Sequence, residues 1–355
     1  VRGGEPRSPA AEWLLDNFFI VTAAARDVWR DLPAEFVRRL PRVAADEYAG
    51  QPRVYALASE LVRLSALRLD AHRLQRFITA FQSVAPLTMG ELWAWPSALK
   101  LVLVEHVRVH ADVLAARRTH RRMADRIATQ FDEASIAGHV WPTEAHPAFV
   151  IRLLQRSQER EDPSALRRQV ELALAAKGHT IEDAIPEEGR HQASEQAAMA
   201  SLIGSLRLIS SFDWSEFFES VSLVEQILQR DPAGVYARMD FRSRDRYRHA
   251  IEELADPTGE AQQHMALASV EYARRIAERT PAARGAHVGY HLIGRGRLAF
   301  EASLAWVPKQ GQRLRRLFFR WAVPAYVGGV AAGRGLLLLP PIVGPVVIEG
   351  ARGRP

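Results

Sequence analysis

Two histidines of this sequence have a spacing that can place both imidazoles on one metal ion. His106 and His110 are four residues apart, so a helix brings them to one face, and Glu105 stands beside them. His120 is too distant to supply a third ligand, because fourteen residues of helix span about 21 Å. We therefore expect surface or half-buried histidines here and no metal site.

A second pattern, formed by Gly294, Gly296 and Ala299, matches the G-x-G-x-x-A fingerprint of dinucleotide-binding folds. Residues 287–293 before it can form the short strand that such a site requires. The residues after it are arginines and a proline-broken apolar tail, which supply neither a second strand nor the acidic residue that binds the ribose. The pattern therefore favours a tight glycine turn between two elements.

An aromatic and acidic segment contains Asp213, Trp214 and Glu216. Tryptophan beside carboxylates makes a surface that can bind a sugar. The same spacing fits a helix start, because Asp213 and Glu216 form a capping box and the following phenylalanines continue an apolar stripe. Both interpretations stay open, and the three residues are candidates for an interaction surface.

The densest basic stretch, residues 238–248, supplies the other candidates, Arg238, Asp240 and Arg244. Arginines interleaved with aromatic residues raise the possibility of nucleic-acid or phosphate binding. Aspartates interrupt the run, however, and no nucleic-acid module is recognisable. A solvated face with local ion pairs is therefore favoured, and nucleic acid is not an expected partner.

Composition limits the functional classes. The chain has 355 residues, of which 48% are hydrophobic and 25% charged, as in an ordinary globular protein. The absence of cysteine excludes disulfides, thiolate ligands and cysteine nucleophiles. The formal charge of +6 is carried mainly by arginine. There is no P-loop, nucleophile elbow or zincin helix, so we assign no catalytic, cofactor-binding or metal residue.

Amphipathic helical spacing dominates the chain before Arg284, which predicts a mainly α fold, a multi-helix array of amphipathic helices. Ser8 and Pro9 predict a helix start, and one helix is expected from there to Pro33. Its apolar stripe contains Leu14, Leu15, Phe18, Val21, Ala25 and Val28. The next stripe, expected to be buried, contains Val54, Leu57, Leu61 and Leu64.

Thr88 and Glu91 form a capping box that opens a helix expected to continue past Ala128, with a kink or break near Pro96. Further helices are expected at residues 148–161, 163–177, 180–209, 214–230, 243–255 and 260–279. Turn-rich segments suggest four parts. These are helical subdomains at 1–145 and 146–284, a connecting segment at 285–316 and an apolar tail at 317–355.

The tail is strongly apolar from Leu317 to Ile348 and follows a group of arginines, which is a membrane signature. Arg334 and several prolines interrupt it, and proline argues against a spanning helix. A native or degraded membrane segment and a tail outside the membrane both stay open. Since the chain begins at Val1 instead of methionine, we expect an excerpt of a longer protein.

Long strings of the sequence resemble, in the same order, the N-terminal region of cyclic β-1,2-glucan synthases. The resemblance covers most of Gly3 to Arg297 and is far more specific than any short motif above. The strings are "GGEPRSPAAEWLLDNFFIV", "QPRVYALASELV", "VAPLTMGELWAWPSALKLVLVEHVR", "LQRSQEREDPS", "SLRLISSFDWSEFFESVSLVEQILQRDPAGVYARMDFRSRDRYRHAIEELA" and "HVGYHLIGRGR".

The resemblance implies a part of a large bacterial inner-membrane protein. In that family a helical N-terminal region precedes membrane helices, a glycosyltransferase domain that uses UDP-glucose with a divalent metal, and a phosphorylase-like module. This chain lacks the catalytic modules, so whether it is itself an enzyme stays open and it carries no cofactor of its own. The expected role is non-catalytic support of glucan synthesis at the cytoplasmic face of the inner membrane.

The expected partners are the transferase and membrane portion of a synthase, with a glucan chain or the membrane as further contacts. An alternative from another class is a free-standing basic helical protein. It would bind an acidic partner, nucleic acid or anionic lipid through its arginines, and phosphate contacts of that kind depend on salt.

Overall fold

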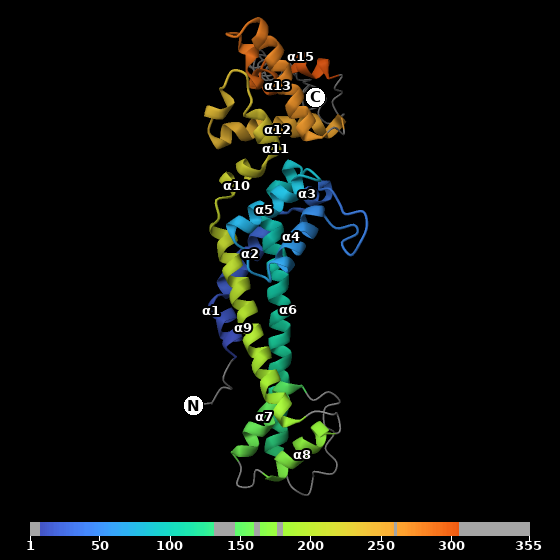
Figure 1. Cartoon of the computed structure of the whole chain (residues 1–355), viewed down its shortest axis with the longest axis vertical. Coiled ribbons are helices and arrows are strands. Elements are labelled where there is room, and N and C mark those ends of the chain that lie inside the picture. The colour runs from blue at the N-terminus through green and yellow to red at the C-terminus, as the bar shows by residue number, and fades with distance from the viewer. Residues whose placement is uncertain (1–7, 131–145, 160–163, 176–179, 259–260, 305–355) are drawn as a thin grey trace, which may run out of the picture. The chain divides into compact units, whose positions relative to one another are not determined.

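The computed structural model describes residues 8–130, 146–159, 164–175, 180–258 and 261–304. These residues form α-helices joined by turns and short 3₁₀ segments (Figure 1). Their one isolated β-bridge pairs Arg42 with Pro52. The predicted mainly α class is therefore confirmed. The chain divides into two compact units, Val1–Gln226 and Ile227–Pro355, and the domain limits expected at 145, 284 and 316 stay predictions.

Several helices of the first unit begin at side-chain caps. Ser8 and Asp70 accept backbone N–H groups at the starts of α1 and α5, and Thr180 and Asp183 form a reciprocal capping box at α9. The helices are α1 (Pro9–Asp16), α2 (Phe18–Asp31), α3 (Ala34–Arg39), α4 (Arg53–Leu64), α5 (Ala71–Gln82), α6 (Met89–Gln130), α7 (Pro147–Gln158), α8 (Ser164–Ala175), α9 (Ile181–Ser211) and α10 (Trp214–Val221). The boundary between the units falls within α11 (Leu223–Leu228).

The prediction of a single helix before Pro33 is wrong, because the helix is interrupted at Asn17, between α1 and α2. The Asn17 side chain donates to the carbonyl oxygen of Trp13 at 2.8 Å and accepts from Arg207 of α9. A short polar side chain of this kind competes with the helical hydrogen bonds. Because of this break, the residues of the expected apolar stripe do not all lie on one helix face, and Leu15 and Phe18 are exposed instead of buried.

The helix α6 is one continuous element through Pro96, so the expected interruption there is not a break. Its start is fixed by Glu91, which is fully buried and accepts both from the backbone N–H of Thr88 and from the Arg53 guanidinium. Pro96 is the eighth residue of the helix, so its missing N–H removes one i→i−4 hydrogen bond, and the helix continues past it.

The N-terminal part of α6 packs against α2 and α4. Trp95, Leu99 and Leu103 are fully buried there, and the apolar face of α4 is buried as expected from its spacing. The exception is Leu64, the last residue of α4, which is 66% exposed. Three members of that predicted stripe are therefore correct and the fourth is wrong.

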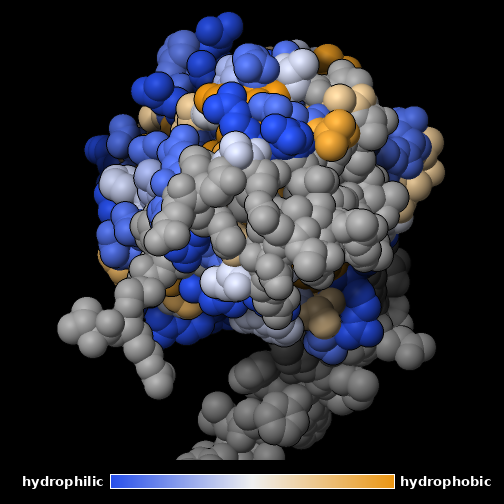
Figure 2. Space-filling view, turned by 90° about the horizontal axis from the view of Figure 1, so that it is seen from below, coloured by the Kyte–Doolittle hydropathy of each residue, from blue (hydrophilic) through white to orange (hydrophobic). Residues whose placement is uncertain are grey.

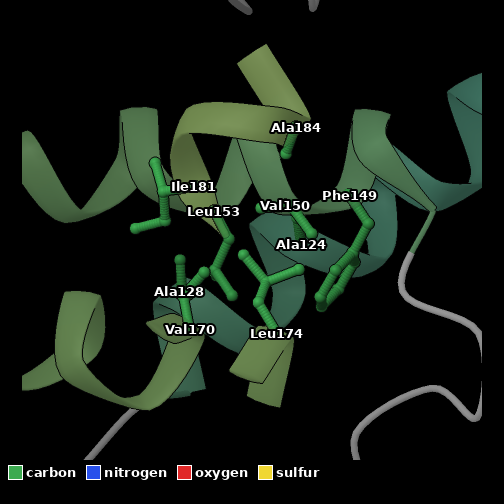
Figure 3. Packing of buried hydrophobic residues seen from close by; sticks show 9 residues of the cluster. All are labelled: Ala124, Ala128, Phe149, Val150, Leu153, Val170, Leu174, Ile181 and Ala184. Atoms are coloured by element: carbon green, nitrogen blue, oxygen red, sulfur yellow. The ribbon is translucent and has the colours of Figure 1, made fainter. Parts of the chain in front are cut away.

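The other end of α6 holds a separate apolar cluster, in which side chains of α6, α7, α8 and α9 converge (Figure 3). Seen from this end, hydrophilic residues cover much of the visible described surface and hydrophobic residues lie between them singly (Figure 2). The apolar sides of these amphipathic helices thus face inward. The cluster consists of Ala124, Ala128, Phe149, Val150, Leu153, Val170, Leu174, Ile181 and Ala184.

The second unit contains two longer helices followed by short ones. α13 contacts α12, η3 and α14, and α14 contacts α15. The elements are η2 (Tyr236–Arg238), α12 (Phe241–Thr258), α13 (Gln262–Arg279), η3 (Arg284–Ala286), α14 (Val288–Leu292) and α15 (Arg297–Ser303).

The apolar tail expected at 317–355 and residues 305–316 of the connecting segment lie outside the described residues. Among the helices that the structure does describe, none has the length and hydropathy needed to cross a membrane.

Candidate functional site

Asp213, Trp214 and Glu216 lie at the start of α10 in the first unit. Asp213 caps the helix by accepting the backbone N–H groups of Ser215 and Glu216 at 3.0 and 3.1 Å. The indole N–H of Trp214 donates to the Ile209 carbonyl at 2.9 Å, so the ring is tied to the end of α9. The Asp213 carboxylate therefore caps a helix and the Trp214 indole fixes the contact between α9 and α10. Sugar binding by this segment stays a prediction.

Arg238, Asp240 and Arg244 belong to the second unit, so the two candidate trios make their contacts in different units. Arg238 donates to the Gly234 carbonyl at 3.0 Å. Asp240 caps α12 by accepting the N–H and hydroxyl of Ser243, and these bonds hold the pKa of its carboxyl below the usual value. The capping role explains the aspartate inside the basic run.

The basic run is not a uniformly solvated face. Arg248 is completely buried, and its guanidinium lies 4.5 Å from the centre of the Phe241 ring. A buried arginine over an aromatic face is a packing contact that holds the first turns of α12.

His106 and His110 are both half-buried, as expected. The Nδ1 atom of His110 lies 2.9 Å from a carboxylate oxygen of Glu195 on α9. Burial lowers the pKa of His106, and the neighbouring His110 lowers it further. Within the ranges that the structure describes, no three His, Asp or Glu side chains are placed to hold a metal ion.

A polar cluster that the sequence did not reveal is centred on Asp231 in the second unit. Its fully buried carboxylate accepts the backbone N–H groups of Val235, Tyr236 and Val288 at 3.0 to 3.2 Å and lies 2.8 Å from Nδ1 of His287. Burial alone would raise the pKa of Asp231, but the hydrogen bonds from His287 and the backbone lower it.

The cluster continues to Tyr247, whose hydroxyl lies 3.2 Å from Nε2 of His287. A Cβ atom at Gly289 would come within 2.3 Å of the Tyr247 ring, so only glycine fits. Gly296 packs equally closely against Tyr290. The strand considered for 287–293 is wrong, because α14 occupies this segment, and the glycines serve close packing between short helices.

A groove of about 450 Å³ lies in the first unit between α2, α3, α4 and α6. Its floor is made by small buried residues of α6, Ala94 and Ala98. At one end the Tyr55 hydroxyl donates to the Glu105 carboxylate at 2.8 Å, and the pKa of Tyr55 is raised by burial and by this bond. Trp29, which is 85% exposed, also lines the groove.

A second cavity, of about 500 Å³, lies between α1, α6 and α9 and is lined by Arg117 and Arg121. Both arginines donate to Glu188, Arg121 at 3.2 Å. Burial raises the pKa of Glu188, but hydrogen bonds from Gln192 and Arg117 hold it below its usual value. Because this buried carboxylate neutralises part of the arginine charge, the cavity is a weaker candidate for an anion site than its lining suggests.

Comparison with known proteins gives one informative similarity. No protein-family model matches the chain. The cyclic β-(1,2)-glucan synthase NdvB of Rhizobium meliloti (strain 1021) is 34% identical over 327 residues, which make up 89% of this chain and 11% of that protein. The chain therefore spans about a tenth of its relative's length. The resemblance inferred from the sequence is confirmed: this chain is a helical region related to one segment of a cyclic β-1,2-glucan synthase.

Proposed function

We propose that this chain is a non-catalytic helical region of a cyclic β-1,2-glucan synthase-like glycosyltransferase, and that it supports glucan synthesis from UDP-glucose. The observation that carries the proposal is the alignment, which takes in 89% of this chain but only 11% of the synthase. In this proposal the transferase chemistry and its divalent metal belong to the remaining modules. The region acts at the cytoplasmic face of the inner membrane in bacteria.

The polar clusters support a structural role for the region. The carboxylates of Glu91, Glu188 and Asp231 are buried, and each is held by several donors from its own unit. Such buried and hydrogen-bonded groups fix the positions of helices. Helices held in fixed positions within a unit provide the pre-organised surface that a docking partner requires.

The alternative, a free-standing basic protein, has less support. Many arginines of the described residues are engaged with acidic side chains inside the chain, for example Arg53 with Glu91, Arg152 with Asp125 and Arg297 with Glu253. These pairs reduce the positive field that would attract nucleic acid or anionic lipid.

An assay of the isolated chain tests the absence of turnover. Purified chain is incubated with radiolabelled UDP-glucose, a glucan acceptor and Mg²⁺ or Mn²⁺, and labelled glucan is measured. We expect none above a protein-free control. Glucan formation that scales with the concentration of the chain would contradict the proposal.

A further inference from the structure

We propose that the groove lined by Trp29, Tyr55 and Glu105 is the surface on which this region docks an amphipathic helix from another part of the synthase. The inference rests on the proposed function and names the contact through which it is exerted. Its occupant is an apolar helix face with a lysine or arginine at the end that meets Glu105.

The apolar lining favours a helix over a sugar. Apart from the indole N–H of Trp29, polar side-chain groups in the groove are confined to Gln51, Tyr55 and Glu105, and apolar residues from four helices and their connections form the rest. The hydroxyls of a bound sugar would lose water there without enough partners. Apolar side chains at i, i+3 or i+4, and i+7 of a helix fit such a groove. The aliphatic residues larger than alanine are Val28, Leu32, Val37, Leu40, Val54 and Leu101.

Trp29 supplies the anchor expected of an interface. It is 85% exposed, and in the described part of the chain its ring stacks on no other aromatic ring. A tryptophan at the mouth of an apolar groove is the residue type that most often dominates binding energy. Its exposure is unfavourable for an isolated chain and is relieved when a partner covers it.

Glu105 specifies the charge of the occupant. Its half-buried carboxylate accepts one hydrogen bond, from Tyr55, and no basic side chain of the described residues lies within ion-pair distance of it. A partly buried carboxylate gains from a cation that approaches from outside. The same charge disfavours the head group of an anionic lipid.

The length of the relative points to its own chain as the source of the helix. Nearly nine-tenths of NdvB lies outside the matched segment, so a region of this kind has a large covalently attached neighbour. Covalent attachment raises the effective concentration of a neighbouring helix, so the groove is occupied even if its intrinsic affinity for that helix is low.

Binding of the full chain to detergent-solubilised NdvB that lacks its matched segment tests the inference. We expect the wild-type chain to bind and Trp29→Ala to bind about 30-fold more weakly. Glu105→Gln should bind about 5- to 10-fold more weakly at low salt, with a smaller loss at high salt. The matched control is Phe19→Ala, on the same helix and 66% exposed but outside the groove, and it should bind like wild type.

Three results would overturn the docking surface. They are absent binding by the wild-type chain, a Trp29→Ala chain that binds as tightly as wild type, and a Trp29 effect that appears equally with lipid vesicles or in self-association of the chain. Glucan synthesis measured in the same mixtures separates the two proposals. If wild type and Trp29→Ala restored synthesis equally, the groove would not be the docking surface, but the proposed supporting role would stand.

Discussion

Buried polar residues fix the positions of segments that are distant in the sequence. Asp231 joins the segment before η2 to the start of α14, and Glu91 joins the start of α6 to Arg53 on α4. In each case a carboxylate without exposed surface is held by several donors, so its removal leaves those donors unsatisfied. The stability of the fold should therefore depend strongly on these two residues.

The Asp231 contacts predict a pH dependence. The pKa of Asp231 is lowered in the folded state, so its contribution is present above the unfolded pKa of about 4 and is lost as pH falls through the folded value. Asp231→Asn should lower the free energy of unfolding by about 2 kcal/mol at pH 7, and by much less at pH 3. Urea unfolding of both proteins at the two pH values measures this. A difference independent of pH would contradict it.

The ion pair of Arg53 and Glu91 predicts that a half-buried and an exposed arginine contribute differently to the free energy of unfolding. Arg53→Met leaves the buried Glu91 carboxylate without its cation and should lower the free energy of unfolding by about 3 kcal/mol. Arg63→Met is the matched control, because Arg63 is largely exposed where it pairs with Glu60, and it should cost under about 1 kcal/mol. Equal losses in urea unfolding would show that the buried pair has no special role.

At the level of helices, local signals predicted most elements. Caps and periodic apolar residues predicted α4, α7 and α9 to within a few residues, because these signals lie within each helix. The break at Asn17 was not predicted, because one asparagine between two apolar runs is a weak local signal, and the Arg207 side chain that also binds Asn17 is 190 residues away in the sequence. The separation of α10 from α11 was also missed, because Ser222 ends the first helix where the apolar stripe continues.

The apolar cluster in Figure 3 predicts that the packing of four helices depends on the side chain of Leu153. Leu153 is fully buried among α6, α8 and α9, so Leu153→Ala should lower the free energy of unfolding by about 3 kcal/mol. Leu172→Ala on α8 is the control, because Leu172 is 59% exposed, and it should cost under about 0.5 kcal/mol. Thermal or urea unfolding that gives similar losses for both variants would contradict this packing.

For the whole molecule, the fold class and the relationship to glucan synthases could be predicted, whereas the candidate docking groove could not. Periodicity identifies the apolar face of each helix but not which faces meet. The groove residues Trp29, Tyr55 and Glu105 come from three helices, and their association appears only when α2 and α4 pack on α6.

The central claim is that this region supports glucan synthesis without turnover of its own. Its most direct test is synthesis of cyclic β-1,2-glucan from UDP-glucose by membrane-embedded NdvB that lacks the matched segment, measured with and without this chain. We predict little product from the truncated synthase, none from the chain alone, and restored synthesis in the mixture. A truncated synthase that works fully by itself, or one that the added chain leaves inactive, would contradict the account.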